Sequence, residues 1–206
     1  MDIKHIYIQS VYTNCYVLVD EDTETAAVID PGDDVTHTVL RLCTDNGFTL
    51  RAIFLTHGHF DHIGGVPPLR KAFPDVPVYL HPEDANLTDP MMNTAGLGPV
   101  TLWRDGEIVP LGKLQVEVLH TPGHTRGSVV LKCRDVLFTG DTLFAGSCGR
   151  TDFPGGSWDQ MMDSLRRLAA LEGDYQILPG HNQSSTLERE RQTNPYLRQA
   201  VLEGGT

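Results

Sequence analysis

The sequence lacks several features that mark other classes of protein. No stretch reaches the roughly 18 uninterrupted apolar residues that a membrane-spanning helix needs, and the start, Met1 to His5, has no signal-peptide pattern. No run rich in Lys or Arg is present, and 27 acidic residues against 16 basic ones give a formal net charge of −11. Because a protein that neutralises phosphates needs a basic surface, we expect neither a membrane nor a nucleic acid as a partner.

Cysteine is also scarce. Small secreted domains use dense, regularly spaced cysteines as a disulfide framework, whereas the four cysteines here are dispersed without C-x-x-C spacing, at Cys15, Cys43, Cys133 and Cys148. This distribution favours a reduced, cytoplasmic protein. Cys148 lies in a glycine-containing turn, where it could face a substrate or be a small buried thiol.

Apolar patterning divides the chain into alternating strands and helices. Predicted strands cover 3–8, 14–19, 26–30, 51–55, 76–80, 107–109, 114–119, 127–132, 135–139 and 175–178, and predicted helices cover 34–46, a short segment after Pro67 and Pro68, 157–171 and 186–192. Strands and helices recur in both halves of the chain, which predicts an α/β fold of two mixed sheets packed face to face with helices outside. Because 206 residues at 40% hydrophobic can bury one substantial core, we predict a single domain over 1–206.

The densest chemical signal lies directly after the predicted strand 51–55. Residues 57–62 read H-x-H-x-D-H, which places three imidazoles and a carboxylate within one short segment. Zinc, iron and manganese accept these ligands, and clustering them beside a buried strand costs stability unless a cation compensates. A solvated loop, or core histidines paired by hydrogen bonds, explains a lone histidine better than three around an aspartate. The motif therefore predicts a metal centre.

Three more candidate ligands, His124, Asp141 and His181, each follow a predicted apolar strand. Their turns read T-P-G-H-T, F-T-G-D-T and L-P-G-H, so glycine or proline frees the backbone where the donor leaves the core. Five histidines and two aspartates exceed what one tetrahedral ion needs, whereas two ions that share a carboxylate use them all. The predicted ligands are His57, His59, Asp61, His62, His124, Asp141 and His181; His5, His37, His81 and His120 lie outside the motifs and are interpreted as surface or structural residues.

In this order the motifs resemble those of the metallo-β-lactamase superfamily, which carries T-H-x-H-x-D-H, P-G-H, G-D and a final H. The resemblance covers nearly the whole chain and implies a four-layer αββα sandwich. It further implies that one ion is held by His57, His59 and His124 and the second by Asp61, His62 and His181, with Asp141 bridging the two. Within the superfamily the chain is most similar to the glyoxalase II (hydroxyacylglutathione hydrolase) branch, through N-C-Y at 14–16, I-D-P-G at 29–32 and F-A-G-S-C-G-R at 144–150.

These residues suggest a metal-dependent hydrolase. In this hypothesis a hydroxide that bridges two ions attacks an acyl carbonyl while one ion polarises the carbonyl oxygen, and Asp61 orients the nucleophile. A thiolate leaving group, with a pKa of about 8.5, needs no general acid, and the sequence offers no obvious candidate acid. A small acyl thioester is therefore favoured over an amide.

The resemblance to glyoxalase II implies a 2-hydroxyacyl thioester of a small thiol such as glutathione. Arg150 matches a basic residue in that family's substrate loop and could bind a carboxylate, although an ion pair with Asp152 or Asp141 would equally explain it. Residues 151–153 do not reproduce the aromatic pair of the longer enzymes, and we expect no helical C-terminal glutathione-binding domain. The segment 88–100 has no clear period and could be either a lid over the site or a simple connection.

Alternative functions use part of the same set of residues. Residues 148–153 are also similar to persulfide dioxygenases of this superfamily, in which His57, His124 and Asp141 would hold a single iron as a facial triad. Lactone or β-lactam hydrolysis would use the same hydroxide as thioester hydrolysis. A non-enzymatic metal-binding module would be expected to have lost ligands, whereas all seven are present. Zinc is the expected metal, with iron or manganese as alternatives, and the sequence does not fix the oligomeric state.

Overall fold

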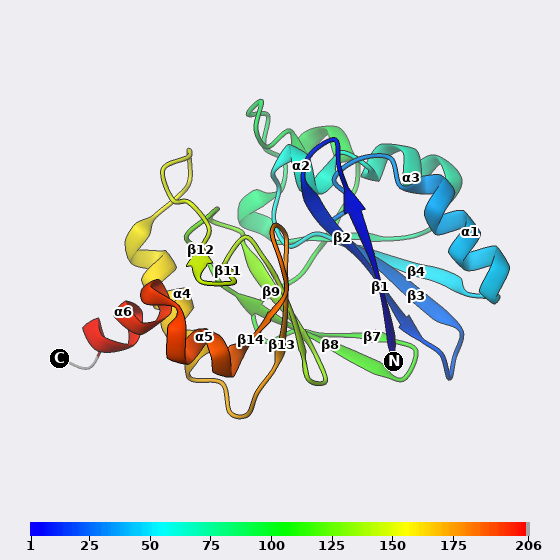
Figure 1. The fold of residues 1–206 in the computed structure, drawn as a ribbon. Coiled ribbons are helices and arrows are strands. Elements are labelled where there is room, and N and C mark those ends of the chain that lie inside the picture. The colour runs from blue at the N-terminus through cyan, green and yellow to red at the C-terminus, as the bar shows by residue number, and fades with distance from the viewer. Residues whose placement is uncertain (205–206) are drawn as a thin grey trace.

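Two six-stranded β-sheets form the centre of the protein in a computed structural model, which describes residues 1–204 (Figure 1). The first sheet follows the order of the sequence, with antiparallel pairing from β1 to β3 and parallel pairing from β3 to β6. Its strands are β1 (Asp2–Ile8), β2 (Thr13–Asp20), β3 (Thr25–Ile29), β4 (Thr49–Phe54), β5 (Val78–Leu80) and β6 (Thr101–Leu102).

The second sheet has the order β14-β13-β10-β9-β8-β7 and is also mixed, because β10 and β13 pair parallel while the other neighbours pair antiparallel. Its strands are β7 (Ile108–Leu111), β8 (Leu114–His120), β9 (Val129–Cys133), β10 (Val136–Gly140), β13 (Gln176–Pro179) and β14 (Ser185–Thr186). A separate two-stranded ribbon consists of β11 (Leu143–Phe144) and β12 (Ser147–Cys148).

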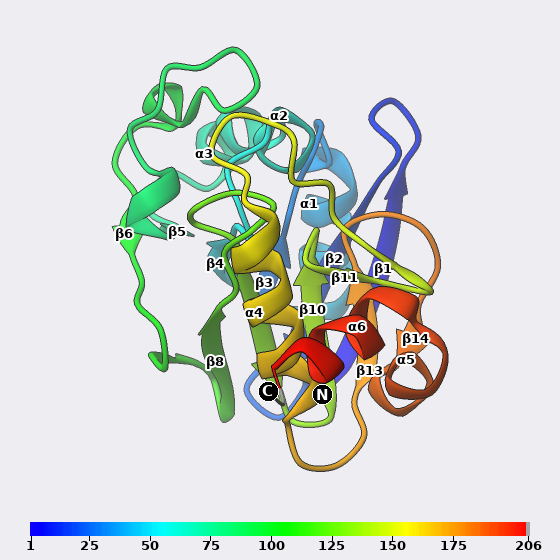
Figure 2. The ribbon, with the colours of Figure 1, turned by 90° about the vertical axis from the view of Figure 1, so that its left-hand side faces the viewer.

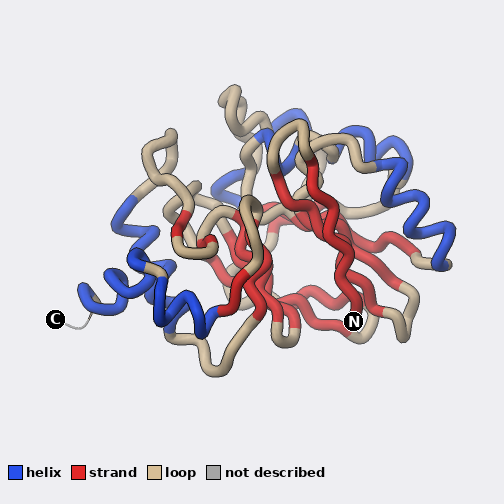
Figure 3. The backbone as a smooth tube through the Cα atoms, in the orientation of Figure 1, coloured by secondary structure: helices blue, strands red, loops and turns tan. Residues whose placement is uncertain are grey.

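Helices cover the outer faces of both sheets, so the strands lie between two helical layers (Figure 3). In the rotated view, α4 and α6 lie in front of β10 and β13 (Figure 2). The helices are α1 (Thr36–Asn46), α2 (Phe60–Ile63), α3 (Val66–Ala72), α4 (Trp158–Ala169), α5 (Leu187–Thr193) and α6 (Pro195–Glu203), with short 3₁₀ turns η1 (Pro82–Asp84) and η2 (Thr94–Leu97).

Three apolar clusters hold these four layers together. The strand β2 shows how, because Val17 and Val19 point to the cluster beneath α1 and α3, whereas Tyr16 and Leu18 point to the cluster between the sheets. A third cluster joins the second sheet to α4, α5 and α6. Strands buried on both faces need continuous apolar runs, and each fully buried aliphatic or aromatic side chain contributes roughly 1.5–3 kcal/mol. The packed sheets therefore form a rigid support for the loops at their edges.

Helix boundaries follow local signals in the sequence. α1 ends at Gly47, which adopts a left-handed conformation with φ 73° and donates its N–H to the carbonyl of Cys43. α4 begins at Ser157, whose side chain accepts a hydrogen bond from the N–H of Gln160. These boundaries confirm the predicted helices 34–46 and 157–171 to within a few residues.

The structure confirms the predicted αββα architecture of two mixed sheets with helices outside. The elements that were not predicted are short or terminal: β6, β11, β12, β14, α2, the two 3₁₀ turns and α6. Among the described residues, no helix has the length and apolar character needed to cross a membrane.

Candidate metal centre

The seven predicted ligand side chains meet at one edge of the two sheets. His57 and His59 follow β4, and the other predicted ligands lie in α2 or follow β8, β10 and β13. Backbone hydrogen bonds join the loops of the two sheets at this edge: the N–H of Val129 donates to the carbonyl of Thr56, and the N–H of Asn14 donates to the carbonyl of Gly180, at 2.8 and 2.7 Å. The packing of one sheet on the other thus brings together donors that are far apart in the sequence.

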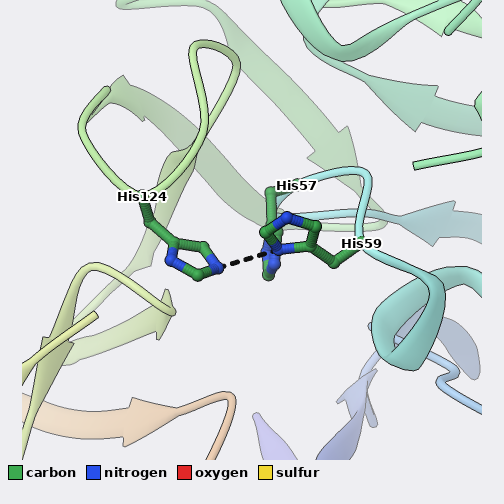
Figure 4. Close-up of side chains that lie close together, drawn as sticks. All are labelled: His57, His59 and His124. Atoms are coloured by element: carbon green, nitrogen blue, oxygen red, sulfur yellow. Dashed lines mark hydrogen bonds between the residues drawn. The ribbon is translucent and has the colours of Figure 1, made fainter. Parts of the chain in front are cut away.

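The donor atoms form three overlapping groups, within each of which they lie within 4.8 Å of one another. Figure 4 shows the first group, in which the Nδ1 of His59 lies 2.9 Å from the Nε2 of His124. Asp141 is central, because its carboxylate oxygens lie 3.4, 3.5 and 3.4 Å from the Nε2 atoms of His62, His124 and His181. The groups are His57, His59 and His124; His57, His62 and Asp141; and Asp61, His62 and His181.

Four of the five histidines are oriented by a hydrogen bond between Nδ1 and an oxygen atom, whereas the Nδ1 of His59 faces the Nε2 of His124. His62 donates to Asp30 Oδ2 at 3.0 Å, His124 to the carbonyl of Arg150 at 2.7 Å, and His181 to the carbonyl of Tyr12 at 2.8 Å. The Nδ1 of His57 lies 3.1 Å from the hydroxyl of Thr56. Because that hydroxyl donates to Asp30 at 2.6 Å, it accepts from His57. The second nitrogen of each of these rings, Nε2, is therefore free to bind a metal when the ring is neutral.

The cluster also contains buried polar atoms without a hydrogen-bond partner. They are the Nε2 atoms of His57, His59 and His62 and the Oδ1 of Asp141. A buried donor or acceptor left unsatisfied costs about 1–3 kcal/mol, and such atoms are rare in native proteins. Nitrogen lone pairs and carboxylate oxygens that face one another are satisfied by a cation. The residues present therefore fit bound divalent metal.

Charge is distributed unevenly over the histidines. Burial, reinforced by the neighbouring histidines, lowers the pKa of His57 well below its usual value and that of His59 to about 4. Burial also opposes protonation of His181, but Asp141 and Asp61 outweigh it and raise the pKa of His181 to about 10. Burial would raise the pKa of Asp141, yet His62 and His181 hold it well below its usual range. The carboxylates are thus ionised, and His57 and His59 are neutral. A bound cation would displace the proton of His181, because a ligating imidazole is neutral.

Asp30 is a positioning residue to which the motif analysis assigned no role. It is buried, and its carboxylate accepts from the N–H and hydroxyl of Thr56, at 2.7 and 2.6 Å, as well as from His62. Two ligands, His57 and His62, are therefore oriented by one carboxylate. The sequence feature that could have pointed to Asp30 is the I-D-P-G turn at 29–32, which places a carboxylate directly after β3.

The cluster opens into a cavity of about 580 Å³. Aromatic and sulfur-containing side chains line much of it, including Phe60, Met91, Phe144, Cys148 and Phe153. Met91 belongs to the segment 88–100, and its carbonyl accepts from the N–H of Phe60 at 2.9 Å. That segment therefore contributes to the wall of the cavity.

Arg150 also lines the cavity and is the only Lys or Arg among the described residues that do so. Its guanidinium donates to both carboxylate oxygens of Asp152, at 2.7 and 2.6 Å, and lies 3.9 Å from the centre of the Phe153 ring. The ion pair anticipated with Asp152 is thus present, and both charged groups remain exposed.

Comparison with known proteins agrees with this geometry. Residues 9–181 match the family model of the metallo-beta-lactamase superfamily. The chain is 34% identical to hydroxyacylglutathione hydrolase GloC of Haemophilus influenzae, over 96% of this chain and 98% of that protein.

Three crystal structures are also similar. BLEG-1 B3 metallo-beta-lactamase has a TM-score of 0.83 and 35% identity, covering 95% of this chain and 99% of that one. ETHE1 from Myxococcus xanthus has a TM-score of 0.80 and 30% identity, covering 98% of this chain and 89% of that one. A protein crystallised in a di-iron-bound form has a TM-score of 0.78 and 36% identity, covering 94% of this chain and 99% of that one. The fold, the His and Asp cluster that implies binding of divalent metal, and these similarities show that the chain belongs to the metallo-beta-lactamase superfamily.

Proposed function

We propose that this protein is a hydrolase of small acyl thioesters that works with two divalent metal ions. The observation that carries the proposal is the clustering of seven donor side chains in three overlapping groups, five of whose members line one cavity. The similarity to GloC supports this substrate class.

His57, His59 and His124 would hold one ion, Asp61, His62 and His181 the other, and Asp141 would lie between them. In support, each of these two triplets has its donor atoms within 4.8 Å, and Asp141 lies within 3.5 Å of histidines from both. When bound, such ions supply a water molecule of lowered pKa and polarise a carbonyl oxygen. We propose zinc, with iron or manganese as alternatives, and the similarity to the di-iron protein supports iron.

Asp61 is the residue we propose to act on the attacking water. Its Oδ2 lies 3.3 Å from the Nε2 of His181, and the side chain reaches the cavity. Burial would raise the pKa of Asp61, but the hydrogen bond from His181 and the charge of His62 lower it, so the group is ionised at neutral pH. An ionised carboxylate can accept a hydrogen bond from water and fix its orientation.

Cys148 is a poor candidate for the nucleophile, although it lines the same cavity. Burial raises the pKa of its thiol to about 11, so the thiolate is scarce at neutral pH. Among the described residues, the cavity walls also contain no Lys or Tyr that could protonate a leaving group. A thioester suits these walls, because its thiolate can leave without a general acid.

Arg150 would bind the thiol portion of the substrate. A carboxylate of the substrate would replace Asp152 as the partner of the guanidinium, while Phe153 keeps the group in place through its ring face. As the only Lys or Arg on the described walls, Arg150 can neutralise one carboxylate at a time. We therefore propose a 2-hydroxyacyl thioester of a small thiol with few charges; glutathione, with two carboxylates, would keep one of them in solvent.

The direct test is release of thiol from S-lactoylglutathione. Lactoyl thioesters of uncharged thiols, a lactone and a β-lactam are measured for comparison. The proposal expects thioester cleavage to exceed cleavage of the other acyl donors by at least tenfold. If a β-lactam or lactone is cleaved faster than every thioester, the proposed substrate class is wrong. That outcome would agree with the similarity to BLEG-1.

A second candidate is the iron-dependent persulfide dioxygenase, which the similarity to ETHE1 supports. His57, His124 and Asp141 would then form the facial triad of one iron. Oxygen uptake with glutathione persulfide, together with one iron per chain, would favour this candidate. Absence of oxygen uptake in an iron-loaded sample would exclude it.

A further inference from the structure

Asp84 is a buried carboxylate that joins the two loops of the three-histidine group. It lies at the end of η1, away from the ligand motifs, and only 1% of its surface is exposed. Its Oδ2 accepts from the N–H of Gly58, at 2.9 Å, and from the hydroxyl of Thr125, at 2.7 Å. Its Oδ1 accepts from the N–H of Gly127 at 2.8 Å. Gly58 lies between His57 and His59, and Thr125 follows His124, so Asp84 contacts both loops next to their ligands.

The hydrogen bonds favour an ionised carboxylate, whereas burial raises the pKa of Asp84 above its usual value. Two of the three groups that contact the Asp84 carboxylate are backbone N–H groups, which can only donate, and the Thr125 hydroxyl is the third. Among the described residues, no Lys or Arg forms an ion pair with Asp84. Burial of a carboxylate without a cation is costly, so a cation bound at the neighbouring three-histidine site would stabilise the ionised form of Asp84 in addition to its three hydrogen bonds.

The surrounding chain is shaped to let the carboxylate approach. A Cβ atom at Gly127 would lie 2.6 Å from the Cγ and 2.7 Å from the Oδ1 of Asp84, so only glycine fits there. The backbone carbonyl of Asp84 accepts from the hydroxyl of Thr94 at 2.6 Å, which fixes η1 to the segment that also supplies Met91 to the cavity wall.

The two halves of the cluster therefore each have a buried carboxylate behind them. Asp30 holds His62 directly and His57 through Thr56, whereas Asp84 reaches the loops that carry His57, His59 and His124. A histidine binds a metal as a neutral imidazole, so among the proposed ligands the first ion would receive negative charge only from Asp141 unless Asp84 adds to it.

We propose that Asp84 is a positioning residue that holds the two loops of the three-histidine site at ligand distance and supplies the charge that favours a cation there. This inference rests on the proposed metal centre and deepens it, because it predicts that Asp84 acts on one of the two sites and not on the other.

The test measures zinc affinity, by competition with a chromophoric chelator, in two single-site backgrounds. His181→Ala leaves the three-histidine site, and His59→Ala leaves the site of Asp61, His62 and His181. Adding Asp84→Asn should weaken binding by about 10–100-fold in the first background, as loss of residues that orient ligands does, and by less than twofold in the second. Activity is not needed for this readout.

Two further variants separate this role from general destabilisation. Thr94→Val removes the anchor of η1 but leaves the Asp84 carboxylate and its three donors in place, so zinc affinity should stay within twofold of the parent. Thr125→Val removes one of the three donors and should weaken the three-histidine site by a smaller factor than Asp84→Asn, which keeps the inference testable if the Asn variant does not fold.

The outcomes are distinct. Selective weakening in the His181→Ala background supports the role of Asp84. Equal weakening in both backgrounds, or full affinity of Asp84→Asn and Thr125→Val in the His181→Ala background, overturns it. If the wild-type protein binds no divalent ion, the proposed metal centre fails, and the role of Asp84 falls with it.

Discussion

Asp61 has the most specific chemical assignment of any single side chain in this protein. It contacts His181 and faces the cavity, so it could orient a water molecule as well as bind a cation. We expect Asp61→Asn to lower kcat by about 10²–10⁴, the range of acid–base contributions, or to lower the occupancy of one metal site. The measurement is kcat together with metal content on the same sample. Wild-type turnover at full metal content would remove Asp61 from the mechanism.

Arg150 provides a second prediction at the scale of the residue. If its guanidinium binds a substrate carboxylate, Arg150→Ala should raise KM by roughly tenfold with little change in kcat. Asp152→Ala should lower KM, because it frees the guanidinium from its present partner. Arg41→Ala, at an exposed position on α1, serves as the matched control. Equal KM values for the wild type, Arg150→Ala and Asp152→Ala would show that Arg150 forms the ion pair but does not bind substrate.

The sequence identifies candidate ligands better than it identifies the residues that orient them. All seven candidate ligands meet, because each motif combines a strand end, a turn and a donor. Asp30 also follows a strand, in an I-D-P-G turn, but that pattern does not show which side chains it orients, and Asp84 lies in no such motif. Their roles depend on burial beside loops that are remote in sequence, as in the contact between Asp84 and Gly127, and a single sequence does not show that.

At the scale of elements, a stacked histidine pair joins the two sheets. His81 follows β5, and His120 ends β8; their rings are 4.1 Å apart at an interplanar angle of 12°. Burial, followed by repulsion from His120, lowers the pKa of His81 from 6.5 to about 4. Between about pH 4 and pH 6.5, His81 binds a proton in the unfolded chain but not in the folded protein. The stability associated with neutral His81 is therefore present above about pH 6.5 and is lost as the pH falls toward 4.

Replacing His81 by Gln should consequently flatten the decline in stability between about pH 6.5 and 4. Urea unfolding at a series of pH values measures this, with the exposed His37→Gln as the control. Parallel stability curves for the wild type and His81→Gln would show that the stacked pair does not titrate as described.

The C-terminal helix α6 packs against the rest of the protein through one face. Leu197 is 1% exposed, whereas the neighbouring Tyr196 is 36% exposed. The reason is that Asn194 caps α6 by accepting from the N–H groups of Tyr196 and Leu197, and helical spacing then turns Leu197 and Ala200 inward.

Leu197 therefore gives a prediction about packing. Leu197→Ala should lower the free energy of unfolding by about 2–5 kcal/mol, through lost burial and a residual cavity against α4. Val201→Ala, at a position that is 49% exposed, should have little effect. Chemical denaturation compares the two variants, and similar losses in both would contradict the assignment of Leu197 to the core.

Elements with a strong apolar pattern were predictable. Strands such as β2 have a continuous apolar run, and helices such as α4 have apolar residues that recur at helical spacing. Two-residue strands such as β6 and β11 carry no such pattern, because their pairing is decided by neighbouring parts of the fold. The prediction of four layers did not depend on them.

At the scale of the whole molecule, the site exists only because two sheets pack together. Residues 57–62 come from the first sheet, while His124, Asp141 and His181 come from the second. The core between the sheets, with Phe54 and Phe138 fully buried, sets the distance between these donors. This division explains why both halves of the chain contain ligands. It also explains why the sequence could supply the set of ligands but not their spacing.

The central claim is that this arrangement holds two divalent ions and hydrolyses a thioester. Metal content per chain, by elemental analysis of protein purified without added metal, tests it most directly when S-lactoylglutathione hydrolysis is measured on the same sample. We predict two metal ions per chain together with hydrolysis. One iron per chain without hydrolysis would contradict the claim and favour sulfur oxidation by a single iron.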